Sequence, residues 1–194
     1  MTLAIVDLGC ANLGSVAIAF ERLGREMKIT ADPAEIAAAD RVVLPGVGAA
    51  GYAMRRIDEL GLREPLKALR QPVLGICLGM QLLFERSEED GAECLGIIPG
   101  AVRRLEPGPG RSVPHMGWSK LQVTGGALGL EDGDYVYFAH SFAVDPGPHV
   151  RASAENGREI PAVVAAGNFI GVQFHPERSG SAGARLLETF VGAR

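Results

Sequence analysis

Short apolar runs alternate with amphipathic segments in the first half of the chain. The apolar runs predict strands, and the segments with apolar residues at helical spacing predict helices. The predicted strands span residues 3–8, 27–30, 41–45 and 72–76, and the predicted helices span 12–23, 33–39, 52–60, 64–69 and 79–85. Strands that alternate with helices favour a mostly parallel sheet with helices on both faces, which is an α/β fold.

The second half of the chain carries short strand patterns separated by turns rich in Gly and Pro. We expect strands at 101–105, 118–123, 135–139, 150–154, 162–166 and 169–174. This pattern predicts an antiparallel extension of the central sheet. A last helix is expected over about 182–191, with Ser179 or Ser181 as its N-cap. Because no long linker interrupts the pattern, residues 1–194 are predicted to form a single domain.

Composition and charge narrow the class of protein. The chain is 47% hydrophobic and 22% charged, which is ordinary for a globular protein. Its net charge of −4, without a basic stripe, argues against a nucleic-acid partner. No apolar run approaches the roughly 20 residues that cross a bilayer, and the N-terminus lacks the basic region of a signal peptide. We therefore expect a cytoplasmic protein with no membrane partner.

One of the three cysteines has a distinctive setting. The odd number and irregular spacing of Cys10, Cys77 and Cys94 do not suggest disulfides or a zinc site, and we expect no metal or cofactor. Cys10 and Cys94 are predicted to be structural. By contrast, Cys77 stands in Gly75-Ile76-Cys77-Leu78-Gly79, between an apolar strand and an amphipathic helix. This pattern is typical of a nucleophile elbow, with cysteine in place of serine.

The elbow pattern has a physical basis. A sharp turn from strand to helix crowds the backbone, so small residues are needed two positions before and after the nucleophile. The turn also places the thiol near a helix N-terminus, where the thiolate is favoured, and directs the Leu78 N–H towards a developing oxyanion. The alternative is that Cys77 is a small buried hydrophobic residue between ordinary turn glycines.

Two further segments supply what a cysteine nucleophile needs. In Gln173-Phe174-His175-Pro176-Glu177, an apolar strand ends in a base and an acid that can orient it. In Leu44-Pro45-Gly46-Val47-Gly48, two glycines allow the backbone N–H of Val47 or Gly48 to serve as a second oxyanion donor. Taken alone, His175 reads as a structural histidine and the glycine loop as a simple turn, but together with the elbow they favour catalysis.

These three segments, in this order, resemble the class I (triad) glutamine amidotransferases over nearly the whole chain. The resemblance implies a mostly parallel sheet flanked by helices, and a Cys-His-Glu triad that hydrolyses glutamine. By this resemblance, Cys77 is the nucleophile, His175 the general base and acid, and Glu177 its orienting acid. It further places Leu78, Val47 and Gly48 in the oxyanion hole, and Gln81 and Gly46 at the bound glutamine.

Three other stretches resemble, within that family, the glutaminase subunits of imidazole glycerol phosphate synthases. They are Pro114 to Trp118, Tyr137 to Phe142, and the segment from Asp7 to Val16. The resemblance implies a heterodimer with a (β/α)8-barrel cyclase that receives the ammonia in histidine biosynthesis. It places four residues at the partner interface: Asn12, Met116, Trp118 and Arg178. The chain departs from the usual pattern at Leu8, Ala11, Ser119 and Arg178, none of which belongs to the triad.

Several alternatives remain open from the sequence. The chain could serve a different amidotransferase synthase, act as a γ-glutamyl hydrolase or cysteine peptidase, or be a non-catalytic regulatory subunit. Trp118 could be a core residue and not an interface residue. Residues 9–15 imitate a phosphate-binding loop, but the lysine required before Ser15 is missing.

Overall fold

The structure, a computed structural model, describes residues 1–9 and 12–192. Cys10 therefore lies outside the described residues, and its predicted structural role stays a prediction. A nine-stranded mixed sheet runs through the molecule in the order β2-β1-β3-β4-β13-β12-β11-β8-β9. Its strands are β1 (Leu3–Val6), β2 (Met27–Thr30), β3 (Arg41–Gly46), β4 (Val73–Cys77), β8 (His115–Val123), β9 (Tyr135–His140), β11 (Val150–Glu155), β12 (Glu159–Ala166) and β13 (Phe169–Val172).

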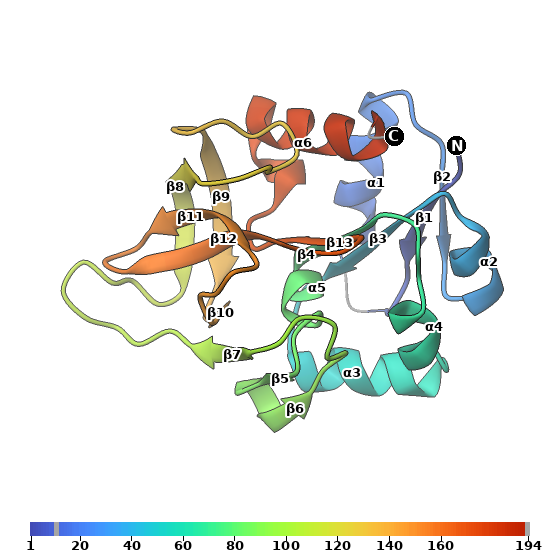
Figure 1. The fold of residues 1–194 in the computed structure, drawn as a ribbon, viewed down its shortest axis with the longest axis horizontal. Helices are drawn as coiled ribbons and strands as arrows, with labels where there is room; N and C mark the ends of the chain where they lie inside the picture. The colour runs from blue at the N-terminus through green and yellow to red at the C-terminus, as the bar shows by residue number, and fades with distance from the viewer. Residues whose placement is uncertain (10–11, 193–194) are drawn as a thin grey trace.

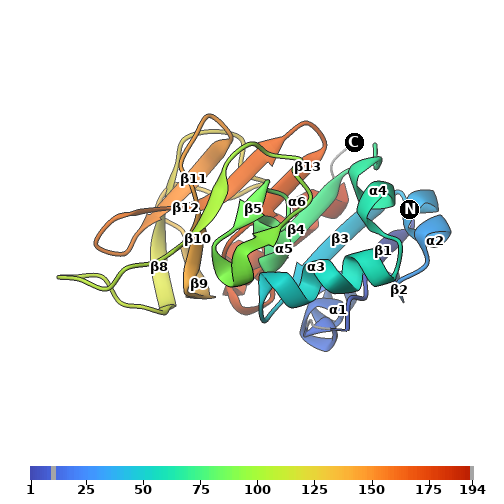
Figure 2. The same cartoon turned by 90° about the horizontal axis from the view of Figure 1, so that it is seen from below.

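Helices cover both faces of the parallel part of this sheet (Figure 1). They are α1 (Leu13–Arg22), α2 (Pro33–Ala38), α3 (Ala50–Glu59), α4 (Arg63–Lys67), α5 (Leu78–Gln81) and α6 (Gly180–Gly192). Helices α1 and α6 lie on one side, and α3 and α4 lie on the other, as Figure 2 shows from below. No helix within the described residues has the length and apolar character needed to cross a membrane.

Alternating side chains of the strands build two separate hydrophobic layers. In β1, Ile5 packs into the layer that contains Phe20 of α1 and Phe190 of α6. Its neighbour Val6 points to the opposite layer, which contains Ile57 of α3. The predicted α/β architecture, with helices on both faces of a mostly parallel core, is therefore confirmed.

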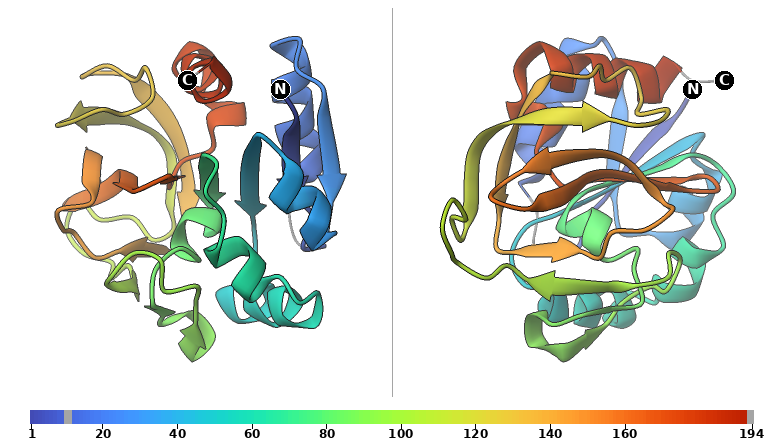
Figure 3. Two further views of the ribbon diagram at one scale, coloured as in Figure 1. Left: turned by 45° about the vertical axis from the view of Figure 1, so that its right-hand side comes forward. Right: turned by 60° about the vertical axis from the view of Figure 1, so that its left-hand side comes forward.

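A second, four-stranded sheet lies beside the α3 face, in the order β10-β7-β5-β6. Its strands are β5 (Arg86–Ser87), β6 (Ala92–Glu93), β7 (Ala101–Arg104) and β10 (Phe142–Val144), with a short 3-10 helix η1 (Glu89–Gly91) between β5 and β6. Figure 3 shows this small sheet apart from the main one. The sequence reading did not predict β5, β6 or β10, because two- and three-residue strands carry too little periodic pattern.

Strand β7, predicted at 101–105 as part of the antiparallel extension, belongs to the small sheet instead. The extension itself consists of β12, β11, β8 and β9, and it also differs from the prediction at its inner border. Strand β13 was expected to belong to it, but β13 pairs in parallel with β4, with Val172 opposite Ile76. Its other edge pairs antiparallel with β12. The apolar residues of β13 gave no indication of strand direction, since an interior strand is apolar on both faces.

Most predicted boundaries lie close to the observed ones, with a few clear corrections. The helix expected over 79–85 ends at Gln81, because Leu83 and Phe84 make short turns back to Met80 and Gln81. Strands β8 and β12 begin earlier than predicted, at His115 and Glu159.

One of the two N-caps predicted for the last helix lies at the expected position. Ser181 lies inside α6. Ser179 precedes the helix, but its hydroxyl donates to the His175 carbonyl at 2.6 Å and accepts from the Tyr137 N–H at 3.0 Å. Ser179 therefore holds the N-cap position, where its carbonyl accepts the Gly183 N–H at 3.1 Å, but its hydroxyl ties the chain after His175 to strand β9 and does not cap α6.

Candidate active site

Three neighbouring strands bring the predicted catalytic segments to one edge of the sheet. Strands β3, β4 and β13 are adjacent and parallel, so their carboxyl ends meet. Cys77 is the last residue of β4, and the Val47-Gly48 loop follows β3. His175 follows β13 and begins the short 3-10 helix η2 (Pro176–Arg178). The order of strands in the sheet therefore assembles residues that are 98 positions apart in the sequence, from 77 to 175.

The turn at Cys77 has the geometry of a nucleophile elbow. Cys77 has a φ of 54° and a ψ of −110°, a region that non-glycine residues rarely adopt. A Cβ on Gly79 would lie 1.8 Å from the Leu44 carbonyl oxygen, and one on Gly75 would lie 2.7 Å from the Gly79 oxygen. Only glycine fits at these two positions, as the sequence predicted. The strained turn is maintained by the packing of α5 against β3 and β4.

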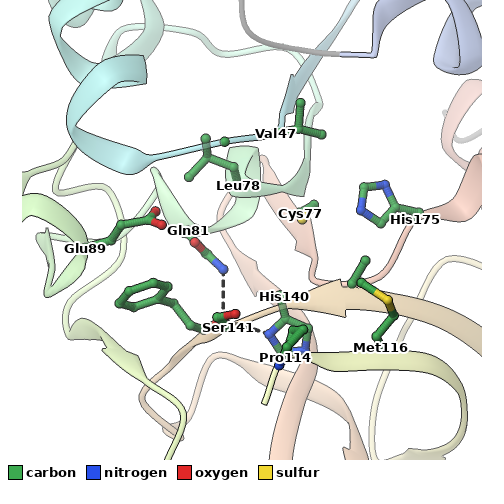
Figure 4. Close-up of a pocket in the computed structure, with 13 residues that line it drawn as sticks. Val47, Cys77, Leu78, Gln81, Glu89, Pro114, Met116, His140, Ser141 and His175 are labelled. Carbon is green, nitrogen blue, oxygen red and sulfur yellow. Dashed lines mark hydrogen bonds between the residues drawn. The ribbon is translucent and has the colours of Figure 1, made fainter. Parts of the chain in front are cut away.

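His175 is held between the thiol and a carboxylate. Its Nδ1 lies 2.8 Å from Glu177 Oε1, and Figure 4 shows its ring beside Cys77. Burial lowers the imidazole pKa, but interaction with Cys77 and with Glu177 outweighs burial, so the pKa of His175 is raised above its ordinary value. The backbone N–H of His175 also donates to the Tyr137 carbonyl at 2.9 Å. Because its pKa is raised, His175 favours the imidazolium form next to the sulfur.

Glu177 is buried behind the imidazole. Its side chain is only 4% exposed. Its second oxygen, Oε2, is buried and receives no hydrogen bond from residues 1–9 and 12–192. The carboxylate therefore depends on His175 for its hydrogen bonding, which ties the two residues together.

A small cavity of about 220 Å³ opens in front of Cys77 (Figure 4). Drug-sized pockets start at roughly 300 Å³, so this space suits a small metabolite. It is lined by Val47, Gly48, Cys77, Leu78, Gln81, Glu89, Pro114, Met116, Ala139, His140, Ser141, Phe142 and His175. Six of the residues predicted from the sequence to act in the site thus face one cavity: Val47, Gly48, Cys77, Leu78, Gln81 and His175.

Comparisons with known proteins agree with this site. A family model described as "Glutamine amidotransferase class-I" matches residues 4–193. The chain belongs to the class I glutamine amidotransferase family. It is therefore a glutamine-hydrolysing enzyme, as the resemblance implied.

Curated relatives indicate which kind of amidotransferase this chain is similar to. A protein of Idiomarina loihiensis named "Imidazole glycerol phosphate synthase subunit HisH" is 50% identical over 192 residues, which covers 98% of this chain and 97% of the relative. A Vibrio cholerae protein of the same name is 48% identical over 196 residues, which covers 96% of each chain. The resemblance to the glutaminase subunits of imidazole glycerol phosphate synthases is thereby confirmed.

Solved structures share the fold of the amidotransferase at lower sequence identity. One described as "Crystal structure of glutamine amidotransferase" has a TM-score of 0.77 at 20% identity, covering 98% of this chain and 97% of the other. The structure of PurLQS from Thermotoga maritima has a TM-score of 0.73 at 21% identity, with the same coverage. These likenesses support the fold alone.

The amidotransferase pocket contains an acid that the sequence reading missed. Glu89 lines the cavity, and its Oε2 accepts the Ala50 N–H at 2.8 Å. Burial raises the pKa of Glu89, and nearby Asp90 adds to the effect, which the Ala50 N–H partly offsets. In the sequence, the acidic run of residues 88–90 looks like a solvated surface. Asp90, with a φ of 59°, bends this run so that Glu89 faces the pocket.

The two glutamine-binding residues predicted from the sequence lie in different settings. Gln81 lines the pocket, and its Nε2 donates to the Phe142 carbonyl at 3.0 Å and to Gln173 Oε1 at 2.9 Å. Gly46 is buried under the loop, where a Cβ would lie 3.0 Å from the Leu78 Cβ. Gly46 thus has a packing role, and its contact with glutamine stays a prediction.

The four residues predicted to face a partner are exposed, and Met116 also lines the pocket. Met116 and Trp118 are 63% and 55% exposed, so Trp118 is not a core residue. The Arg178 guanidinium lies 4.1 Å from the centre of the Tyr137 ring, next to Trp118. Asn12 is exposed at the start of α1, where its side chain accepts the Ser15 N–H. These positions are open to a partner, and their role in docking stays a prediction.

Cys94 is a buried thiol for which burial outweighs the attraction of a nearby cation, Arg63. It is 6% exposed within the layer beneath α3. Burial raises the pKa of its thiol to about 11, so the thiol stays protonated at neutral pH. The structure thus agrees with the structural role predicted for Cys94.

Proposed function

We propose that this chain hydrolyses the side-chain amide of glutamine and delivers the ammonia to a cyclase subunit with a (β/α)8 barrel. The pair would act as imidazole glycerol phosphate synthase in histidine biosynthesis, in the cytoplasm. The observation that carries the hydrolytic part is the strained Cys77 beside an imidazole whose other nitrogen bonds to Glu177. The names of the curated relatives support the pathway.

The reaction proceeds through a thioester. The Cys77 thiolate attacks the amide carbon of glutamine, and the carbonyl oxygen becomes an oxyanion. The His175 imidazolium gives its proton to the departing nitrogen, and ammonia leaves as the carbon–nitrogen bond breaks. Neutral His175 then takes a proton from water, whose oxygen attacks the thioester. Glutamate leaves, and the thiolate–imidazolium pair is restored.

Backbone N–H groups around the sulfur stabilise the oxyanion in this proposal. Leu78 begins the helix after Cys77, and the Val47-Gly48 loop lies across the same cavity. Each such donor is worth about 2.7–4 kcal/mol in comparable sites. Loss of one such donor from the loop after β3 would therefore lower kcat about 10²- to 10³-fold.

Acceptors on the far side of the cavity suit the α-ammonium group of glutamine. Both N–H bonds of the Gln81 amide are used by Phe142 and Gln173, so only its Oε1 is open to a ligand. The Glu89 carboxylate lies beside it in Figure 4. A carboxylate and an amide oxygen together favour a cation. Glutamine would thus bind with its amide at Cys77 and its ammonium group at Glu89.

A docked partner explains the exposed aromatic and sulfur-containing side chains at the rim. Met116 lines the cavity and is the most exposed of these side chains. Large apolar side chains and tryptophan are typical of interface centres. Ammonia released into water would be protonated and lost, so a partner over this rim would retain it.

Glutamate release tests the proposal directly. We would measure it with the chain alone, and then with the barrel cyclase and its nucleotide substrate. Cys77→Ala serves as the inactive variant, and Cys94→Ala is the matched control for removing a buried thiol. Strong stimulation by cyclase and nucleotide, lost only in Cys77→Ala, is the expected result.

Three other outcomes would contradict parts of the proposal. Activity that depends on Cys77 but is indifferent to the cyclase would retain the chemistry and reject the pathway. Cleavage of γ-glutamyl peptides in preference to glutamine would favour a hydrolase without a partner. No turnover in any mixture would favour a regulatory subunit.

A further inference from the structure

A row of hydrogen-bonded side chains connects a hollow on the surface with the wall of the active-site pocket. Ser119 lines a surface cavity of about 710 Å³ over strands β8 and β9. Its hydroxyl lies 2.8 Å from His115 Nε2, and His115 Nδ1 lies 3.0 Å from His140 Nε2. His140 lines the active-site pocket, where its Nδ1 lies 2.7 Å from the Phe142 carbonyl oxygen. Every ring nitrogen of the two histidines therefore has a partner.

The Phe142 carbonyl oxygen is the last acceptor of this row, and it fixes which atom donates in each hydrogen bond of the row. A carbonyl oxygen only accepts, so His140 must carry its proton on Nδ1. Burial lowers the pKa of His115 to about 4 and that of His140 to about 3, so both rings are neutral near pH 7. Neutral His140 then accepts through Nε2, which requires the proton of His115 on Nδ1. His115 Nε2 is left to accept from the Ser119 hydroxyl.

The row ends on a carbonyl that also holds a substrate-facing side chain. The Phe142 oxygen accepts from Gln81 Nε2 as well as from His140 (Figure 4). Gln81 Nε2 donates in addition to Gln173 Oε1. Gln173 Nε2 in turn lies 3.8 Å from Cys77 Sγ. One connected network thus reaches from the surface hydroxyl of Ser119 to the nucleophile.

We propose that Ser119, His115 and His140 are positioning residues that hold the Phe142 carbonyl, and through it the Gln81 amide, in place. This inference rests on the proposed glutaminase function. If donor and acceptor were exchanged in each hydrogen bond of the row, the Nδ1 lone pair of His140 would face the Phe142 oxygen. Repulsion would then displace that carbonyl. Gln81 Oε1 would then no longer point at the ammonium group of glutamine. Since Ser119 is reached from the surface, a group that binds its hydroxyl changes the shape of the glutamine pocket.

Nuclear magnetic resonance of the histidine side chains tests the direction of the row in the unaltered protein. In water, a neutral imidazole carries its proton mainly on Nε2. We expect His115 and His140 both to carry it on Nδ1 near pH 7. His149 is an internal reference, because its Nε2 lies 3.2 Å from the Asp145 carbonyl oxygen and must carry the proton. An Nε2 proton or a positive charge on His115 or His140 would overturn the proposal.

Removal of the first donor tests the effect on substrate. Ser119→Ala should raise KM for glutamine about three- to tenfold, as expected for one lost hydrogen bond, with a smaller change in kcat. Ser119→Thr retains a hydroxyl and should restore KM. Thr124→Val is the matched control, because its hydroxyl bonds to the Arg151 carbonyl, outside the row. An unchanged KM in Ser119→Ala would overturn the proposal.

Substitutions of His140 separate positioning from simple support of the fold. His140→Asn keeps an N–H near the Nδ1 position, whereas His140→Leu removes it. A larger rise in KM for the leucine variant, at similar thermal stability, is the expected result, and equal effects would overturn the proposal. Failure of the proposed function would instead appear as no glutamate release by the unaltered chain, while the proton positions would still be measurable.

Discussion

The two walls of one pocket hold buried imidazoles that differ in charge: one is positively charged and the other two are neutral. On the wall formed by β4 and β13, His175 lies between Cys77 and Glu177, and its pKa is raised. On the wall formed by β8 and β9, burial lowers the pKa of His115 and His140 to about 4 and 3. All three residues are less than one tenth exposed, so burial does not explain the difference.

The difference comes from what each ring contacts. His175 faces Cys77 and, through its Nδ1, the Glu177 carboxylate, and both interactions favour the charged ring. His115 and His140 face each other, a serine hydroxyl and a carbonyl oxygen, and none of these groups carries a charge. One wall is therefore built for proton transfer, and the other is built to hold a fixed pattern of neutral donors and acceptors.

Removal of the carboxylate should weaken the preference of His175 for the charged form, although the interaction with Cys77 remains. Glu177→Gln keeps the shape of the side chain but removes the charge that favours the imidazolium. We expect kcat to fall about 10³- to 10⁴-fold, as for comparable changes in other triads, with little change in KM. Steady-state glutamate release measures both constants. A fall of less than tenfold would mean that Glu177 is not the orienting acid.

Acid should destabilise the neutral wall, which holds His115 and His140. It should leave intact the charged wall, which holds His175. Below pH 6.5 the unfolded chain binds protons at His115 and His140 that the folded chain binds only near pH 4 and 3, so the free energy of unfolding falls as the pH drops. Each ring should account for about 2 kcal/mol between pH 6.5 and 5. For His175 the sign is opposite: its raised pKa stabilises the folded state fully below pH 6.5, and this contribution is lost as the pH rises.

Urea unfolding at pH 7 and pH 5 measures this effect. The His140→Asn variant should lose less stability on acidification than the unaltered protein, because it lacks one of the two neutral rings. Thr124→Val, which lies outside the row, should lose as much as the unaltered protein. An equal acid loss in all three proteins would show that the two rings are not held neutral.

The residues of the charged wall could be predicted from the sequence, because short segments of the chain carry the patterns that identify them. Cys77 is flanked by the glycines that its own turn requires, and His175 and Glu177 are two positions apart. Each segment follows a strand, and parallel strands place such ends together. The pattern therefore predicted both the residues and their meeting, even though it placed β13 in the antiparallel extension.

The neutral wall depends on register, which a single sequence does not show. His115 meets His140 because the two residues are paired across β8 and β9, and a shift of one residue would turn one ring to the outer face. The strand predicted at 118–123 did not even include His115. Glu89 was missed for a related reason, because the bend at Asp90 and the hydrogen bond to Ala50 turn it inward.

The smallest expected effect concerns Glu89, which lies between the two walls. Glu89→Gln keeps an oxygen for the Ala50 N–H but removes the charge that would bind the ammonium group of glutamine. We expect KM to rise about tenfold, which corresponds to the lower end of the range of about 1.5–3 kcal/mol for a hydrogen bond to a charged group, while kcat stays nearly unchanged. Because the pKa of Glu89 is raised, KM of the unaltered enzyme should also rise as the pH falls and the carboxylate is protonated. Glu88→Gln is the matched control, because Glu88 is exposed and bonds to Arg103 and the Arg104 N–H. If Glu89→Gln lowered kcat and left KM unchanged, Glu89 would belong to the proton-transfer wall, and the division between the two walls would fail.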